Sequence, residues 1–302
     1  MNVIDIKNFS LSRGKNNQIF HHYTNVDALI NIMTEQKLRF TDCMFLNDKE
    51  EYNYIFTVVD KCFKDNKELK DILDFSITGI DRKNNKTYIA YNNGFRIKDG
   101  RYYILSGCLK SDLLPMWNYY SINSNIYGYS IKFSIDELIN SFKDTDADIY
   151  KGKVIYDFDK QVRIIERYVK EKCKKTEAII RKLNKSNEDE YQREFESIWE
   201  DTHSDIYEFI SFIRLFFKSS SWKYEEEYRI VILAEPDGNL IKKKFKSAKG
   251  VVKPYIEVEL KKIPITEIKI GPNIEKEVAR AGLEELIGNK KIEIKESILL
   301  VR

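Results

Sequence analysis

Charged side chains recur at alternate positions just before the apolar run IVIL. They are Glu225, Glu227 and Arg229. If this segment is a strand, successive side chains point to opposite faces, so these three lie on one face. Such a row is typical of a solvated sheet edge or of a site that recognises polar hydroxyl groups, and the residues alone leave both interpretations open.

Two adjacent histidines form a second candidate, in the segment His21-His22-Tyr23-Thr24. Neighbouring residues of a strand point to opposite faces, so only one imidazole can line a given pocket. Because the segment leads into a predicted helix N-terminus, a histidine here is well placed to donate to a ribose hydroxyl or a phosphate. A partly exposed histidine bonded to the backbone is the structural alternative.

An aromatic pair supplies the third candidate. Trp117 and Tyr120 are three residues apart, after a strand that ends near Ser106. They share one face if the stretch is helical, and they would then offer an aromatic wall for a flat ring. Packing in the core is the alternative.

Composition and missing motifs exclude several classes of protein. The 302 residues carry 51 Lys and Arg against 48 Asp and Glu, a net charge of +3 that is too weak to indicate nucleic-acid binding. No phosphate-binding loop, dinucleotide glycine motif, HExxH or GxSxG occurs. The four cysteines form no CxxC pair, which argues against a zinc site and disulfides and for a reducing cytoplasm. We expect no metal, no membrane association and a cytoplasmic location.

Hydrophobic periodicity predicts the elements that position these residues. Strands are expected over 18–23, 37–40, 101–109, 127–133, 154–156, 226–235, 255–260, 265–271 and 291–301, with a loop and hairpin over 80–100. Helices are expected after Thr24, with Val26, Leu29, Ile30 and Met33 on the apolar face, after Asn47 or Asp48, and over 275–286. Residues 111–121 are expected to form a short helix or turn.

The order of these elements predicts an α+β fold. Strands lie at both ends of the chain, whereas two helices, separated near 186–190, occupy 159–217. We therefore predict a single domain over residues 1–302 with a helical insertion at about 159–217. The two helices are expected to pack against each other, because each has a long apolar face.

Several short motifs in this order resemble a bacterial family called domain of unknown function 2971. They are HYT followed by a short helix, LRFT, LNDKEE, MWNYY, GYSIKF, K-x3-W-x2-E-x-EYRIV and IKIGP, which span residues 20–272. More loosely, a histidine strand before a helix, a central aromatic element and a late strand opening with Glu-Tyr are similar to the His-Tyr-Glu class of the ADP-ribosyltransferase superfamily.

The second resemblance implies a fold and a chemistry. Members of that class hold NAD in a cleft between two small packed β-sheets, so a split sheet is expected here. The resemblance assigns His22 to the ribose-contacting position and Glu227 to the carboxylate that bonds the ribose 2′-hydroxyl. Tyr120, Trp117 and Tyr103 are candidates for the aromatic residue that stacks on nicotinamide. Further NAD-binding candidates are Tyr23, Thr24, Glu225 and Arg229.

The function expected from this resemblance is an NAD-using ADP-ribosyltransferase or NAD glycohydrolase. It would act as a bacterial toxin or antiphage effector on an unknown protein or nucleic-acid target, with an antitoxin or defence-system partner. A non-catalytic domain that recognises a nucleotide or a protein is the alternative. A metal-dependent nuclease using Asp48, Glu51, Glu225 and Glu227 is the third hypothesis.

Overall fold

The structure is a computed structural model. It describes residues 3–5, 18–46, 51, 53–65, 101–120, 127–143, 147–183, 186–234, 242–248 and 250–299. The chain divides into two compact units. The first comprises Met1–Phe45, Arg101–Val154 and Ser221–Arg302, and the second comprises Leu46–Gly100 and Ile155–Ser220. The predicted helix cap at Asn47 or Asp48 and the predicted loop over 80–100 lie outside the described residues.

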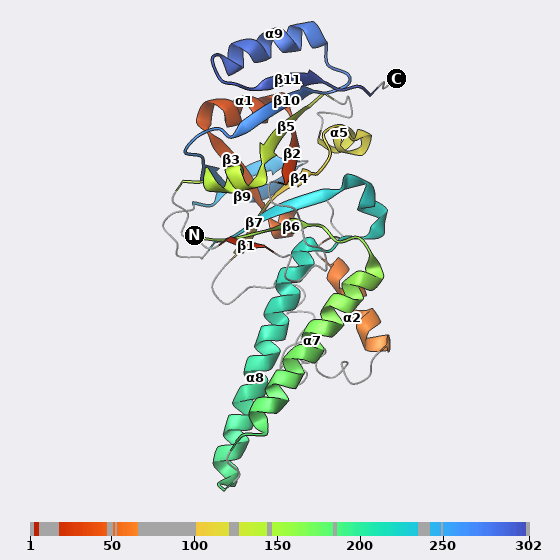
Figure 1. Ribbon diagram of the computed structural model, residues 1–302, viewed down its shortest axis with the longest axis vertical. Coiled ribbons are helices and arrows are strands. Elements are labelled where there is room, and N and C mark those ends of the chain that lie inside the picture. The colour runs from red at the N-terminus through yellow and green to blue at the C-terminus, as the bar shows by residue number, and fades with distance from the viewer. Residues whose placement is uncertain are drawn as a thin grey trace. The chain divides into compact units, whose positions relative to one another are not determined.

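The first unit is built on one hydrogen-bonded sheet, which contains eleven strands in the described residues (Figure 1). Its main path runs in the order β1 (Val3–Asp5), β6 (Asp148–Lys153), β7 (Glu227–Ala234), β4 (Arg101–Cys108), β2 (Ile19–Thr24), β5 (Tyr129–Ser134), β10 (Ile265–Ile270) and β11 (Glu293–Glu296). A branch adds β3 (Lys37–Asp42), β9 (Val251–Glu259) and β8 (Lys244–Ala248).

The sheet forks at one edge of β4. The first half of β4 pairs with β3, through Thr41 with Ile104, whereas its end pairs with β2, through His21 with Cys108. Two arms therefore diverge from a shared strand. The mixed α and β composition is confirmed, and the two sheets expected from the sequence are arms of one network joined through β4.

Alternation along the strands gives the sheet one apolar face, which we call the core face. Its residues are buried in one cluster and include Phe20, Leu105, Ile131, Ile230 and Ile268. Helix α9 (Lys276–Ile287) covers part of it with Leu283 and Ile287. Burying this face supplies the main driving force for folding of the unit.

Helix α1 (Val26–Glu35) packs on the same core but is rotated from the predicted orientation. Its buried residues are Leu29, Ile32 and Met33, whereas Val26 is 41% and Ile30 is 42% exposed. The N-cap is Asn25, whose side chain accepts a hydrogen bond from the Ala28 N–H at 2.8 Å. Thr24, the predicted cap, instead ends strand β2.

The second unit contains the predicted helical insertion. Helices α7 (Phe158–Ile180) and α8 (Glu188–Ile213) lie side by side, and α2 (Tyr54–Asp65) contacts α7 (Figure 1). The rings of Tyr168 and Phe209 stack with centroids 3.7 Å apart, and the hydroxyls of Thr176 and Thr202 are 2.7 Å apart. The predicted helix pair is therefore confirmed. In the described part of the chain, no helix is both long and apolar enough to cross a membrane.

Candidate functional site

The face of the sheet opposite the core carries polar side chains from five neighbouring strands, and we call it the polar face. Its members are His21 and Tyr23 of β2, Cys108 of β4, Ser130 and Lys132 of β5, Glu227 and Arg229 of β7, and Glu267 and Lys269 of β10. Most of them are buried: Lys132 is the most exposed of the nine. A buried polar surface of this kind is unusual in a sheet that needs it only for stability.

Strand register aligns five polar-face residues into one row across the sheet. His21 pairs with Cys108 on one side and with Lys132 on the other. Cys108 in turn pairs with Glu227, and Lys132 pairs with Glu267. Because directly paired residues project to the same side, the five side chains form a continuous row from β7 to β10.

The register separates His22 from Glu227, which the sequence analysis had placed in one site. His22 follows His21 on β2 and therefore points to the core face, as does Thr24. It is His21 that shares the polar face with Glu227. Sequence alone cannot choose between adjacent histidines, because the choice depends on pairing with β4.

His22 has a structural partner at the fork of the sheet. Its Nδ1 lies 3.0 Å from the carbonyl oxygen of Ser106, so this nitrogen carries the proton and donates. The ring lies parallel to Phe20, with centroids 6.5 Å apart. Burial lowers the pKa of His22, and the nearby charge of Lys246 lowers it further, whereas the bond to Ser106 acts in the opposite direction. A neutral His22 therefore ties β2 to β4 where the arms diverge.

Glu227 and Arg229 form a two-pronged ion pair on β7. The Arg229 Nε and Nη2 atoms donate to the two carboxylate oxygens of Glu227, each at 2.8 Å. Glu227 is 5% and Arg229 is 1% exposed. Bidentate geometry fixes the carboxylate orientation, and removal of either partner would leave a buried charge without its main counter-charge.

Glu227 and Arg229 lie on one face of β7 as predicted, but Glu225 does not belong to this strand. Glu225 ends a 3-10 helix (Ser220–Glu225), and β7 begins only at Glu227. Between them Glu226 adopts φ 45°, a left-handed conformation that interrupts the strand geometry. Glu226 pairs with Lys110 near the surface. Glu225 is buried but does not belong to the row on β7.

One of the three candidate aromatic residues lies beside the polar face. Trp117, in helix α5 (Leu114–Tyr120), packs edge-on against Tyr23 with ring centroids 4.7 Å apart. Its Nε1 donates to Asp112 at 2.8 Å. Tyr103 belongs to the core cluster, and the Tyr120 side chain lies outside the described residues.

Hydrogen bonds fix this aromatic pair. The Tyr23 hydroxyl donates to the Lys110 carbonyl at 3.1 Å and accepts from the Leu113 N–H at 3.0 Å. Tyr23 and Trp117 are 2% and 1% exposed. The pair therefore anchors α5 to β2 and borders the polar face as a rigid aromatic wall.

Two neutral groups occupy the middle of the row. Burial lowers the pKa of His21 to about 4; Glu267 raises it, whereas Lys132, Lys269 and Lys295 lower it. Burial raises the pKa of the Cys108 thiol to about 11, although the Lys110 N–H donates to its sulfur. Both groups are uncharged at neutral pH. His21 Nδ1 is buried and has no hydrogen-bond partner among the residues that the structure describes.

The β5–β10 end of the polar face is rich in lysine. Glu267 accepts from Lys295 of β11 at 2.7 Å and lies 3.6 Å from Lys132. Burial raises the pKa of Glu267, but the hydrogen bond from Lys295 and the nearby lysine charges outweigh it, so the pKa is lowered overall. Lys269 donates instead to the hydroxyl of Ser111 at 3.0 Å.

The residues at the β5–β10 end of the polar face were not among the site residues predicted from the sequence. The signal was present in the segments YSIKFS and ITEIKI, where small or charged residues alternate with apolar ones. That alternation predicts strands with one polar face. It does not reveal that the two polar faces lie side by side, because their residues are more than 130 positions apart in the chain.

No group of three or more His, Cys, Asp or Glu side chains suited to a metal ion occurs within the described ranges. Of the residues in the nuclease hypothesis, Asp48 lies outside those ranges. Glu51 belongs to the second unit, where its carboxylate lies 3.6 Å from Lys218 Nζ.

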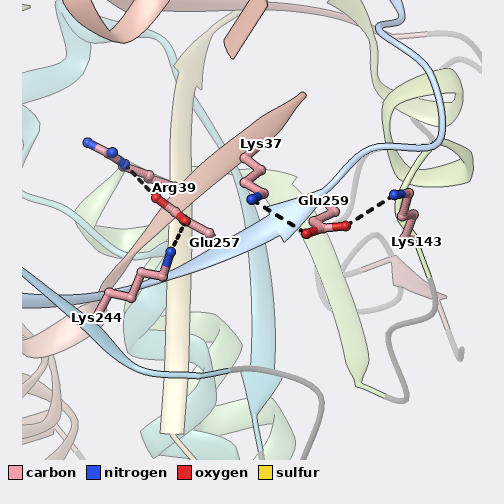
Figure 2. Close-up of polar contacts among 6 residues, drawn as sticks. All are labelled: Lys37, Arg39, Lys143, Lys244, Glu257 and Glu259. Atoms are coloured by element: carbon pink, nitrogen blue, oxygen red, sulfur yellow. Dashed lines mark hydrogen bonds and ion pairs between the residues drawn. The ribbon is translucent and has the colours of Figure 1, made fainter. Parts of the chain in front are cut away.

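A second set of charges lies on the outer face of the β3–β9–β8 arm, and we call it the outer network (Figure 2). Glu257 accepts from Arg39 at 3.1 Å and also from Lys244. Glu259 lies between Lys37, at 3.5 Å, and Lys143, at 3.1 Å. Each carboxylate is thus matched by two cations.

Comparison with known families gives a match to part of the chain. The model of the family described as "Protein of unknown function (DUF2971)" matches residues 116–230, from α5 through β7. The match supports the family resemblance that the sequence motifs indicated. No curated protein and no solved structure matches the chain.

Proposed function

We propose that this protein uses NAD, either as an ADP-ribosyltransferase or as an NAD glycohydrolase, and that the reaction takes place on the polar face. The observation that carries the proposal is the row in which Glu227, Cys108 and His21 stand on adjacent strands with their side chains on one side. Adjacent strands are about 4.8 Å apart, so Glu227 and His21 are separated by roughly 10 Å at the backbone.

Glu227 is the residue for the bond-breaking step. Cleavage of the bond between nicotinamide and ribose develops positive charge on the sugar, as in glycoside hydrolysis. A carboxylate that bonds the ribose 2′-hydroxyl stabilises this charge mainly in the transition state. The bidentate bond from Arg229 would hold that carboxylate in a fixed orientation. Nicotinamide leaves as a stable neutral molecule, and water or the acceptor group forms the new bond to the same ribose carbon.

His21 takes the role that the family resemblance gave to its neighbour His22. Its low pKa keeps the ring neutral, with one nitrogen able to donate and the other able to accept. Nδ1 has no partner in the described structure, so it is available to a ligand hydroxyl. Trp117 and Tyr23 would border the nicotinamide or adenine ring.

The test is release of nicotinamide from NAD by the purified full chain, measured by chromatography. Glu227→Gln should reduce turnover about a hundred- to a thousandfold, the scale for removing one preorganised transition-state group. Glu226→Gln is the matched control, because Glu226 is the adjacent residue and lies outside the row. Melting curves of both variants distinguish lost chemistry from lost folding. Equal rates in wild type and a correctly folded Glu227→Gln protein would exclude the catalytic role.

A second candidate is a domain that recognises a nucleotide without cleaving it. The Glu227–Arg229 pair favours this alternative, because a bidentate guanidinium neutralises the carboxylate and reduces its stabilisation of a developing cation. This alternative predicts that the protein binds ADP-ribose but releases no nicotinamide from NAD. An active enzyme would do both.

The proposed biological role is that of a toxin or antiphage effector in bacteria, with an antitoxin or defence-system partner and an unidentified macromolecular target. Expression of the wild-type chain in a bacterial host should lower cellular NAD or modify a host macromolecule and arrest growth. Glu227→Gln should do neither. Growth arrest by both proteins would separate toxicity from this chemistry.

A further inference from the structure

Lys269 is a buried cation without a carboxylate partner in the described structure. It is 9% exposed, and its ammonium donates to the neutral hydroxyl of Ser111 at 3.0 Å. Glu267, two residues earlier on β10, is instead bonded to Lys295 and lies 3.6 Å from Lys132. Glu267 is near enough for its charge to act on Lys269 but is not bonded to it. Burying an ammonium group that is not bonded to a carboxylate is unfavourable, so this arrangement favours an anion from outside the chain.

Two unsatisfied polar atoms lie in the same region of the polar face. Ser130 is the direct cross-strand partner of Lys269, and its buried hydroxyl has no hydrogen-bond partner within the described part of the chain. His21 Nδ1, on β2 at the other side of β5, is also buried and has no partner among the described residues, in a side chain that is 7% exposed. Native structures satisfy nearly all buried polar groups, so an unsatisfied hydroxyl opposite Lys269 and an unsatisfied imidazole nitrogen two strands away indicate that this region binds a hydrogen-bonding ligand.

The charge of the surrounding residues is positive. Lys132, Lys269 and Lys295 lie around the carboxylate of Glu267, and Lys295 also pairs with Glu293 at 3.1 Å, so three lysines face two carboxylates in this part of the sheet. Lys132 and Lys295 are 30% and 43% exposed at their side chains, so the cluster reaches solvent on their side. The ligand that fits is small, carries negative charge and accepts several hydrogen bonds.

We infer that a phosphate-bearing ligand binds here, with its phosphate oxygens bonded to Lys269, Ser111 and Ser130. His21, Lys132 and Lys295 lie beside this ligand. An ammonium group and two hydroxyls are donors that phosphate oxygens accept well. The inference deepens the proposed function by naming the phosphate subsite, and it rests on that function only for the identity of the ligand as a dinucleotide.

Titration calorimetry with three probes tests the inference. Inorganic pyrophosphate supplies phosphate alone, ADP-ribose supplies phosphate within a nucleotide, and adenosine supplies the nucleoside alone. We expect the wild-type chain to bind ADP-ribose and pyrophosphate, and adenosine much more weakly. Binding of adenosine as tight as that of ADP-ribose, with no heat from pyrophosphate, would overturn the phosphate subsite.

Lys269→Met and the control Lys262→Met locate the site. Removing a charge-assisted hydrogen bond should weaken pyrophosphate and ADP-ribose binding about ten- to a hundredfold in Lys269→Met. Lys262 is an exposed lysine in the turn before β10, so its substitution removes the same charge without touching the polar face. Equal weakening by both substitutions would mean that the anions bind through general charge rather than at Lys269.

Stability of the ligand-free protein provides an independent readout. Methionine in place of a buried lysine that is not bonded to a carboxylate should raise the melting temperature by a few degrees. Lys269→Met would then be more stable and bind less, which a purely structural lysine would not produce. A lysine needed for the fold would instead give a lower melting temperature and refute the inference.

Ser130→Ala provides a second variant that keeps every charge. It removes a hydroxyl without a partner, so the ligand-free protein should melt as wild type does, while pyrophosphate binding weakens. Unchanged binding in both Ser130→Ala and Lys269→Met would overturn the inference. Lys269-dependent binding without nicotinamide release would leave the phosphate subsite in place and refute only the catalytic proposal.

Discussion

The outer network and the polar face use the same charged residue types in different ways. In the outer network, Glu257 and Glu259 each lie between two cations, and Glu259 is about half exposed (Figure 2). On the polar face, the described residues give the buried Lys269 no bonded carboxylate, and they leave His21 Nδ1 and the Ser130 hydroxyl without hydrogen-bond partners. Exposed charges that form ion pairs need no further partner, whereas buried polar groups without a bonding partner indicate a ligand.

The polar face itself divides into two ends. At the β7 end, Glu227 and Arg229 satisfy each other with two hydrogen bonds at 2.8 Å. At the β10 end, cations outnumber carboxylates. At the β7 end the charged groups are already paired without a ligand, whereas the excess of cations at the β10 end favours binding of an anionic ligand. This contrast matches a site with a preoriented reactive group and a separate charge-binding region.

The largest expected effect is on the buried pair. Glu227→Ala should destabilise the protein by about 3–5 kcal/mol, because it removes the carboxylate that accepts two hydrogen bonds from the buried Arg229 guanidinium. Glu257→Ala, in the outer network, should cost about 1 kcal/mol or less, because its two cations reach water and salt screens them. Chemical denaturation of the two variants measures both values. Equal losses would mean that burial does not distinguish the two regions.

A double variant sharpens this comparison. Replacing Glu227 with Gln and Arg229 with Met removes both charges together and should recover most of the stability that Glu227→Ala loses. A double variant as unstable as the single one would show that the pair's other contacts, and not its charges, hold this end of the sheet together.

Stability should also depend on pH through His21. Its pKa is about 4 in the folded protein and 6.5 as the ordinary value, so the unfolded chain binds more protons between these pH values. The free energy of unfolding should therefore fall as pH is lowered from 6.5 to 4, by up to about 3 kcal/mol from this residue.

His21→Gln is the control for this dependence, since glutamine takes up no proton. Denaturation of the variant across the same pH range should show a smaller loss of stability than the wild type. His22 has its pKa lowered in the same direction, so part of the dependence should survive. Identical pH profiles for wild type and His21→Gln would contradict a neutral buried His21.

The smallest effect is expected at Glu259. Substitution by glutamine removes one charge from an exposed position between Lys37 and Lys143. The melting temperature at physiological salt should stay within the measurement error, because exposed ion pairs contribute little. A drop comparable to that of Glu227→Ala would place the outer network among the structural determinants of the fold.

Sequence patterns predicted the elements better than the site. The alternation in EYRIVIL was enough to place Glu227 and Arg229 on one face, and the 3.6-residue period identified the helix pair of residues 159–217. The left-handed Glu226 that separates Glu225 from the strand was not visible. A single backbone dihedral of this kind depends on the packing around it, since glutamate has no preference for it.

Strand register explains why the resemblance pointed to His22 whereas His21 is the histidine on the polar face. His21 and His22 are equivalent in a strand pattern, and only the pairing with Cys108 and Lys132 decides which one faces Glu227. The same holds for Lys269, whose neighbours Ser130 and Ser111 come from other parts of the chain. Long-range pairing of this kind is set by the fold as a whole, and local propensity carries little information about it.

The most direct test compares these two histidines as ligand-binding residues. Titration calorimetry with ADP-ribose on His21→Ala and His22→Ala uses adjacent residues that point to opposite faces of one strand. If the polar face binds the ligand, His21→Ala should weaken binding about tenfold, and the folded His22→Ala protein should bind as wild type does. Weaker binding in His22→Ala with wild-type affinity in His21→Ala would contradict the account and move the site to the core side of the sheet.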